Sequence, residues 1–336
     1  MQTGSVYIIA EAGVNHNGDL SLARQLVDVA AEAGADAVKF QTFNAEQLAD
    51  PGAEKAKYQQ QTTGTEENQL EMLRKLELSK EDHLALLDHC KRREIQFLST
   101  AFDLDSVDFL AGLDLPYWKI PSGEITHVPY LERIAATGKP VFISTGMAYL
   151  GEIEFALDQF LRNGYSREFI TILHCTTDYP ARFSDLNLNA IRSLQAAFGT
   201  GVGYSDHSSG LEASVAAVAL GATVIEKHFT VDRTLPGPDH RASLEPDELA
   251  GLVRAIRNVS AALGDGLKGP TEPELANRPI VRKGIYASRS IQAGDLLGPE
   301  NLVCKRPVGR LPAELWSRVV GKKASRDFAM GESLEL

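Results

Sequence analysis

The sequence lacks any apolar run long enough to cross a membrane, because charged residues or glycines interrupt its longest apolar stretches. The first residues, MQTGSV, contain neither the basic nor the apolar segment of a secretory signal. Cysteine is scarce: Cys90, Cys175 and Cys304 lie far apart and show no metal-binding spacing. We therefore expect a cytoplasmic protein with reduced thiols and no membrane association.

The sequence also has no excess of positively charged residues. The 336 residues include 34 Lys and Arg against 45 Asp and Glu, which gives a net charge of -11 at pH 7. This balance argues against a nucleic-acid partner. It does not exclude an anionic small molecule, since a few basic side chains gathered in a cleft reverse the local field.

The sequence has no G-x-G-x-x-G turn after its first predicted strand, which argues against an open, doubly wound sheet. It does have a repeated pattern in which a short β-rich run precedes helix-like sequence. The eight runs are 6–11, 37–41, 96–100, 117–120, 141–144, 170–174, 202–205 and 224–227. Eight such units in about 250 residues predict an α/β fold, the closed (β/α)8 or TIM barrel.

The pattern changes after Gly264, where a helix predicted over 245–263 ends. Residues 265–281 have the glycine and proline content of a linker. Short β runs at 284–288 and 301–305 follow, which predicts a small β-rich domain over 282–336. The expected organisation is thus a barrel over 1–264, a linker and a small domain that is near the lower size limit for independent stability.

Polar residues end each predicted strand, and in a TIM barrel these ends surround the active site. His207 and His228 end strands that are neighbours about 5 Å apart. Either histidine alone would more often be a hydrogen-bonded rim residue, but the matched pair favours a divalent metal site. Asp206 and Glu226 are candidates for further ligands, for residues that support the ligands, or for ion-pair partners of Lys227.

Two lysines, Lys39 and Lys119, also fall at predicted strand ends. A lysine there is costly unless an anion neutralises it. That anion is either a nearby carboxylate, Glu11 or Glu124, or a bound phosphate or carboxylate held with neighbouring hydroxyl and backbone N–H groups. A third alternative is a Schiff-base lysine.

A proline- and glycine-rich loop over 232–240 follows the eighth predicted strand. Its PGPD segment predicts a rigid loop above the barrel rim. Asp239 in this loop is a candidate for orienting a sugar hydroxyl or transferring protons. The alternative is an aspartate that only caps a turn.

Several motifs occur in order along nearly the whole chain. They are EAGVNHNG (11–18), VKFQT (38–42), STAF (99–102), KIPSGE (119–124), STGM (144–147), HCTTDYP (174–180), GYSDH (203–207), EKHFT (226–230) and PGPD (236–239). Together they resemble the sialic acid synthase family, and residues 305–307 and 321–324 resemble its C-terminal antifreeze-like domain.

The resemblance implies a reaction in which phosphoenolpyruvate condenses with the open-chain aldehyde of an N-acetylated mannose-type sugar. The products are a nine-carbon 2-keto sugar acid and phosphate, formed with C–O bond cleavage after water attacks C2. It also implies a homodimer with swapped domains, in which Arg306 of one subunit reaches the N-acetyl end of the sugar in the other.

The resemblance further assigns roles to individual residues. The expected catalytic residues are Glu11, Glu226 and Asp239. The expected ligands of a divalent cation, Mn2+ or else Mg2+ or Co2+, are His207 and His228. The expected phosphoenolpyruvate-binding residues are Lys39, Thr100, Lys119, Ser122 and Ser144. The expected sugar-binding residues are Gln41, Phe102, Glu124, Thr177, Tyr179 and Arg306.

The long polar insert over 44–68 and Thr177, where many family members have Asn, depart from the N-acetylneuraminate synthases. The insert resembles that of the bacterial branch that makes legionaminic-type sugars, whose acceptor is a 2,4-diacetamido-2,4,6-trideoxy-mannose analogue. Two other functions stay open from the residues alone. One is a Schiff-base aldolase or lyase that uses Lys39 or Lys119, and the other is a non-catalytic carbohydrate-binding protein.

Overall fold

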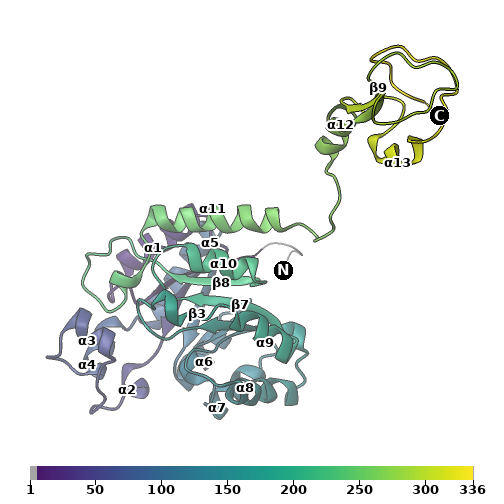
Figure 1. Ribbon diagram of the computed structural model, residues 1–336. Helices are drawn as coiled ribbons and strands as arrows, with labels where there is room; N and C mark the ends of the chain where they lie inside the picture. The colour runs from purple at the N-terminus through teal and green to yellow at the C-terminus, as the bar shows by residue number, and fades with distance from the viewer. Residues whose placement is uncertain (1–5, 336) are drawn as a thin grey trace. The chain divides into compact units, whose positions relative to one another are not determined.

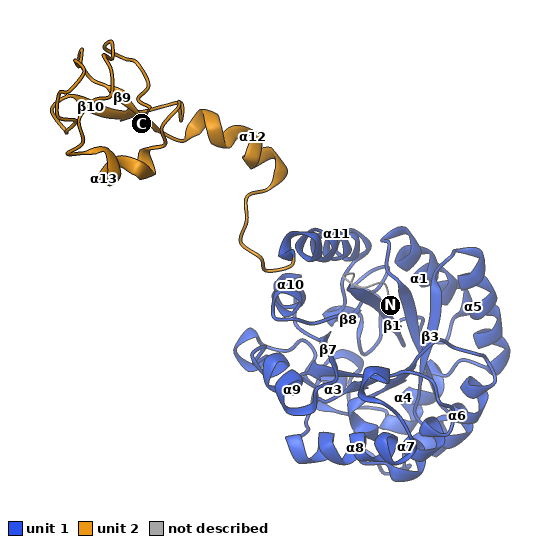
Figure 2. Ribbon diagram, turned by 90° about the vertical axis from the view of Figure 1, so that its right-hand side faces the viewer, with its two compact units in different colours: residues 1–264 blue, residues 265–336 orange. Residues whose placement is uncertain are grey.

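The computed structural model describes residues 6–335 and divides the chain into two compact units (Figure 2). Unit 1 is Met1–Gly264 and unit 2 is Asp265–Leu336. Each unit has its own hydrophobic core. Within residues 6–335, no helix is both long and apolar enough to cross a bilayer.

Unit 1 is an eight-stranded parallel barrel (Figure 1). Its strands are β1 (Tyr7–Gly13), β2 (Ala37–Thr42), β3 (Gln96–Ala101), β4 (Trp118–Ile120), β5 (Val141–Ser144), β6 (Ile170–Cys175), β7 (Gly201–Asp206) and β8 (Val224–His228). The sheet order is β3-β2-β1-β8-β7-β6-β5-β4, and β3 lies beside β4 to close the ring. The predicted TIM barrel is therefore confirmed, with every strand within two residues of its predicted bounds.

Helices follow the strands and cover the outside of the barrel (Figure 2). They are α1 (Leu20–Glu32), α5 (Lys80–Arg92), α6 (Leu104–Ala111), α7 (Val128–Ala135), α8 (Leu150–Arg162), α9 (Ala190–Phe198), α10 (Glu212–Ala219) and α11 (Pro246–Leu263). The Asp19 carboxylate accepts hydrogen bonds from the first-turn N–H groups of Ser21 and Leu22, which caps α1.

Shorter helices occupy the loops. The segment between β2 and α5 contains α2 (Ala45–Leu48), α3 (Lys57–Thr63) and α4 (Gln69–Leu76). The 3-10 turns are η1 (Ser122–Glu124), η2 (Arg167–Phe169), η3 (Phe183–Asp185), η4 (His240–Ala242) and η5 (Ala313–Leu315). The polar insert predicted over 44–68 thus contains two short helices, α2 and α3, and α4 follows it directly.

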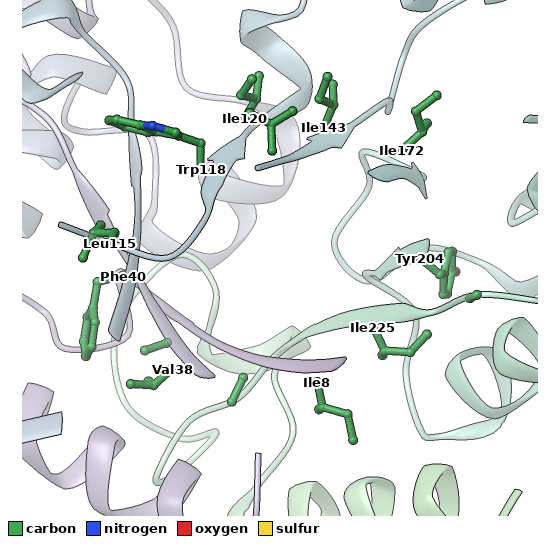
Figure 3. Packing of buried hydrophobic residues seen from close by; sticks show 14 of the residues in the cluster. Ile8, Val38, Phe40, Leu115, Trp118, Ile120, Ile143, Ile172, Tyr204 and Ile225 are labelled. Atoms are coloured by element: carbon green, nitrogen blue, oxygen red, sulfur yellow. The ribbon is translucent and has the colours of Figure 1, made fainter. Parts of the chain in front are cut away.

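Side chains alternate in direction along each strand, so the barrel has two separate hydrophobic clusters. Side chains such as Ile8, Val38 and Ile225 point outward and pack in the layer between barrel and helices (Figure 3). Their neighbours Ile9 and Ala37 belong to a second cluster inside the barrel. On the inward face, the residue two positions after each of these apolar side chains carries a polar group of the candidate site. The apolar cluster inside the barrel therefore lies directly beneath the site.

Unit 2 is a small β-rich domain, as predicted. Its strands β9 (Gly284–Ala287) and β10 (Leu302–Lys305) pair antiparallel, and a short helix, α13 (Trp316–Val319), follows. The buried side chains of Ile285, Phe328 and Leu334 belong to its core. The segment predicted as a linker contains one more helix, α12 (Glu272–Val281), whose residues are all exposed.

Candidate active site

A cavity of about 300 Å³ opens at the carboxyl ends of the barrel strands. Fourteen of the fifteen site residues predicted within the barrel line it: Glu11, Lys39, Gln41, Thr100, Phe102, Lys119, Ser122, Ser144, Thr177, Tyr179, His207, Glu226, His228 and Asp239. These residues converge because side chains alternate in direction along a strand. Residues two positions apart therefore share the inward face, as do Lys39 and Gln41 on β2 and Glu226 and His228 on β8.

Four buried charged side chains form an ion network at the base of the cavity. The Lys39 Nζ lies 2.6 Å from Glu11 Oε2 and 3.7 Å from Glu226 Oε2. It also donates a hydrogen bond to Thr100 Oγ1 at 2.8 Å. The Lys119 Nζ lies 3.2 Å from Glu226 Oε1. The predicted pairing of Lys39 with Glu11 is present, while Glu226 joins the two lysines.

The two carboxylates of this network differ in their protonation. Burial raises the pKa of Glu11 to about 7, although the charge of Lys39 opposes the shift. Burial acts on Glu226 too, but Lys119 and Lys39 outweigh it and hold the pKa of that carboxyl well below its usual range. Near neutral pH two lysines therefore face one fully ionised carboxylate and one that is partly protonated, which leaves the cavity base net positive and suited to an anion.

The same network disfavours a Schiff-base role for Lys39. Burial alone would lower the pKa of its ammonium group, but Glu11 and Glu226 raise it above its usual value. A Schiff-base lysine must be unprotonated to attack a carbonyl, and such lysines have lowered pKa values. The electrostatics of Lys39 are thus opposite to those that an aldolase of this kind requires.

The two histidines lie together at the ends of β7 and β8, with ring centroids 5.5 Å apart. The His207 Nδ1 is 2.7 Å from the Thr176 carbonyl oxygen and donates to it, so Nε2 is the ring nitrogen that a ligand could use. Burial lowers the pKa of this ring, but the Cys175 thiol and the Thr176 carbonyl outweigh it and raise the pKa above its usual value. The pKa of His228 is held well below its usual value by burial and by His207. Its Nδ1 is buried with no hydrogen-bond partner in the described part of the chain.

A metal ligand pair requires an unprotonated nitrogen on each ring, which His228 already has and which His207 would gain when a cation displaces its proton. Among residues 6–335, no group of three or more His, Cys, Asp or Glu side chains is arranged to hold a metal ion. The two histidines alone would give a cation two protein ligands and leave its other positions to water or substrate.

Of the three roles that the sequence left open for Asp206, the structure shows the ion pair and not a metal ligand. Asp206 lies next to His207 in sequence, so its side chain points to the opposite, outward face of β7. There its carboxylate pairs with the Lys227 ammonium at 2.8 Å and accepts a hydrogen bond from Ser214 Oγ at 2.7 Å. The alternative, an ion pair with Lys227, is the arrangement observed.

Hydroxyl and backbone groups surround the lysines. The Ser122 Oγ accepts a hydrogen bond from the Gly146 N–H at 2.8 Å. The Ser144 Oγ is buried without a hydrogen-bond partner among the described residues, so it is free for a ligand. A Cβ at Gly146 would lie 2.1 Å from Thr177 Oγ1, which explains why the chain requires glycine at this close approach.

On the other side of the cavity, Tyr179 stands between two rings. Its ring centroid is 4.1 Å from that of His207 and 4.8 Å from that of Tyr58. Two predicted sugar-binding residues are placed differently. The Glu124 carboxylate does not line the cavity but pairs with His127 Nδ1 at 2.7 Å. Arg306 belongs to unit 2, so its contact with a sugar stays a prediction.

Sequence reasoning missed the cavity residues that come from the insert and from α4. They are Leu48, Tyr58, Gln59, Gln69, Met72, Leu73 and Leu76. The helical spacing of Met72, Leu73 and Leu76 signals an amphipathic helix. Nothing in the sequence alone says over which part of the barrel that helix folds.

Asp239 supplies a pH-dependent prediction. Burial raises the pKa of its carboxyl to about 6, and its Oδ1 has no hydrogen-bond partner among the described residues. Because the folded pKa lies above the unfolded value, this group's contribution to stability is complete below pH 4 and is lost as pH rises through 6. We expect Asp239→Asn to be more stable than wild type by up to about 3 kcal/mol at pH 8.

The measurement is urea unfolding of the wild type and of Asp239→Asn between pH 4.5 and 8, together with turnover. The stability difference between them should grow with pH while the variant loses activity. A difference that does not change with pH would show that Asp239 is already ionised in the folded protein at low pH.

Comparison with known proteins identifies the family. The NeuB family model matches residues 26–268, and the SAF domain model matches residues 282–335. The chain belongs to the NeuB family. It is 52% identical to the N,N'-diacetyllegionaminic acid synthase of Campylobacter jejuni over 97% of both chains, and 47% identical to the enzyme of that name from Legionella pneumophila over 98% of this chain and 93% of the other.

A solved structure agrees with this family membership. The sialic acid synthetase of Leptospira borgpetersenii, crystallised with citrate, is 37% identical and superposes with a TM-score of 0.71 over 81% of this chain and 90% of the other. The resemblance to sialic acid synthases is thereby confirmed, and this NeuB family chain is an enzyme. The non-catalytic alternative does not explain the buried, unpartnered polar groups of its cavity.

Proposed function

We propose that this cavity condenses phosphoenolpyruvate with the open-chain aldehyde of an N-acetylated mannose-type sugar. The acceptor is N-acetylmannosamine or its 2,4-diacetamido-2,4,6-trideoxy analogue, and the products are a nine-carbon 2-keto sugar acid and phosphate. The observation that carries the proposal is the buried ion network, in which Lys39 and Lys119 give the base of the cavity a net positive charge. The names of the two legionaminic acid synthases support it.

In the proposed reaction, the double-bond electrons of phosphoenolpyruvate form a bond from C3 to the aldehyde carbon. The aldehyde oxygen takes up a proton, for which the buried carboxyl of Asp239, with its pKa of about 6, is the candidate donor. Positive charge develops at C2, next to which the ionised Glu226 carboxylate would be stabilising.

Water then adds to C2, and Glu11 is the candidate base for its proton, since burial brings the pKa of this carboxyl to about 7. The resulting intermediate carries hydroxyl and phosphate on the same carbon. It forms the 2-keto group by breaking the bond between C2 and the bridging oxygen, so that phosphate leaves with that oxygen. Ser122, Ser144 and Thr100 are the proposed hydroxyl contacts of the phosphate and carboxylate.

We propose His207 and His228 as the ligands of a divalent cation, Mn2+ by preference with Mg2+ and Co2+ as alternatives. The support is the closeness of the two rings, the unpartnered Nδ1 of His228 and the lowered pKa of that ring, which keeps it neutral. Such a cation, when bound, acts as a Lewis acid toward a carbonyl oxygen.

The proposed assembly is a cytoplasmic homodimer in which Arg306 of one subunit reaches the sugar site of the other. An exposed apolar patch at the barrel rim supports an interface. Met147 and Tyr149, which follow β5, are 71% and 83% exposed. Leu150 follows them and is 54% exposed, so these neighbours form a contiguous apolar stretch of the kind that marks an interaction surface.

The experiment that tests the proposed reaction separates it from a Schiff-base aldolase. Phosphate release should require phosphoenolpyruvate and an acceptor sugar, and it should be lost after chelation and restored by Mn2+. Borohydride added with pyruvate should leave the protein mass unchanged, because Lys39 is protonated and paired. A pyruvyl adduct on Lys39 or Lys119 with chelator-resistant activity would establish the aldolase instead.

A further inference from the structure

One side of the cavity is apolar although its base is charged. Six residues that line it belong to one hydrophobic cluster, which we call the apolar wall: Val14, Leu48, Met72, Leu73, Leu76 and Phe102. Val14 directly follows β1 and Phe102 directly follows β3. The other four come from α2 and α4, the helices inserted between β2 and α5.

The apolar wall and the charged network occupy different levels of the site. Lys39 and Glu226 lie within strands, on the inward face of the barrel. Every residue of the wall lies beyond the last residue of a strand, above β1 to β3. With phosphoenolpyruvate, the anionic substrate, on the lysines, the uncharged acceptor lies nearer the opening, beside the wall.

Part of the apolar wall is not covered by other residues. Met72 and Leu76 are buried, but Leu48, Leu73 and Phe102 are only partly buried although they pack against the same cluster. Since these three side chains line the cavity, apolar surface is available to a ligand there. A hydroxyl placed against it would lose water without gaining a hydrogen bond, whereas a methyl group would not.

We propose that the apolar wall is an acceptor-specificity subsite, which binds the methyl groups of a 6-deoxy, N-acetylated sugar in preference to a hydroxylated chain. This inference rests on the proposed function, because it concerns the acceptor of that reaction. Leu48 and Leu73 are its specificity-determining residues, and both belong to helices that the barrel fold itself does not require.

The test compares kcat/KM for N-acetylmannosamine and for 2,4-diacetamido-2,4,6-trideoxymannose, measured as phosphate release. The wild type should favour the trideoxy sugar by about 10- to 100-fold, the discrimination that small apolar differences give in an apolar pocket. In Leu73→Gln this ratio should fall about tenfold, mainly through KM for the trideoxy sugar. Glutamine keeps the length and helix propensity of leucine but offers a hydrogen-bonding group.

Leu48→Gln is the second variant and should change the ratio in the same direction. Leu84→Gln is the matched control, since Leu84 lies on α5, is 49% exposed and does not line the cavity. An unchanged ratio in both wall variants, with normal circular dichroism, overturns the subsite alone. Absence of phosphate release from the wild type with either acceptor overturns the proposed function and the subsite with it.

Discussion

We expect His228→Ala to lower the turnover of this enzyme by at least about 1,000-fold, and His207→Ala to do the same. The physical reason is that the two imidazoles, with ring centroids 5.5 Å apart, are the proposed ligands of the divalent cation. Losing Lewis-acid stabilisation of several kcal/mol corresponds to a loss of this size, because each 1.4 kcal/mol is tenfold in rate. The measurement is turnover together with metal content after gel filtration.

His89→Ala is the matched control, because His89 lies on α5 and hydrogen-bonds to Asp28 at 2.8 Å outside the cavity. It should keep the metal content and rate of the wild type. If His207→Ala or His228→Ala also kept both, the assignment of the histidine pair as a metal site would be wrong.

Lys39→Met should lose both activity and stability. Removing the ammonium leaves the buried carboxylates of Glu11 and Glu226 with Lys119 as the one remaining lysine of the network. Breaking a buried pair by removing one partner costs at most about 3–5 kcal/mol in free energy of unfolding, and less here because Glu11, with a pKa of about 7, can take up a proton instead of staying charged. The measurement is urea unfolding at pH 7.5, with phosphate release as the activity readout.

The double variant Lys39→Met, Glu11→Gln separates the two effects. It should recover most of the lost stability, since no uncompensated charge is left, but none of the activity. Lys139→Met is the surface control: Lys139 pairs with Asp114, whose side chain is 99% exposed, so the loss should be at most about 1 kcal/mol. A stable but inactive Lys39→Met single variant would mean that Glu11 is already protonated in the wild type.

Much of the fold follows from local sequence patterns. Inward and outward positions alternate along each strand, so the eight β-rich runs could be located from apolar residues alone. The same alternation places Glu226 on the face of His228, two residues away, and Asp206 on the face opposite to His207. Applied at each strand end, this rule would have removed Asp206 from the candidate ligands.

Contacts across the barrel could not be predicted in this way. Lys119 on β4 pairs with Glu226 on β8, and these strands are not neighbours in the sheet. Their distance depends on how the ring closes, which no local pattern specifies. The sequence therefore indicated the charged residues of the site, but not that Glu226 would be held ionised while burial raises the pKa of Glu11.

The insert was the least predictable part. Its polar composition suggested only a long loop, yet Tyr58 on α3 stacks against Tyr179, and Thr62 Oγ1 donates a hydrogen bond to the Pro238 carbonyl at 3.3 Å. These contacts join segments that are more than 100 residues apart in the chain. Such docking depends on tertiary packing, which overrides what composition predicts.

The most direct test of the proposed condensation follows the bridging oxygen of phosphoenolpyruvate. The substrate is labelled with 18O between C2 and phosphorus and incubated with the enzyme, Mn2+ and the trideoxy acceptor. C–O cleavage predicts one labelled oxygen in each phosphate, formed in equal amount to the keto sugar acid and only when the sugar is present. Label retained in the keto acid, or phosphate released without sugar, would contradict the proposed reaction.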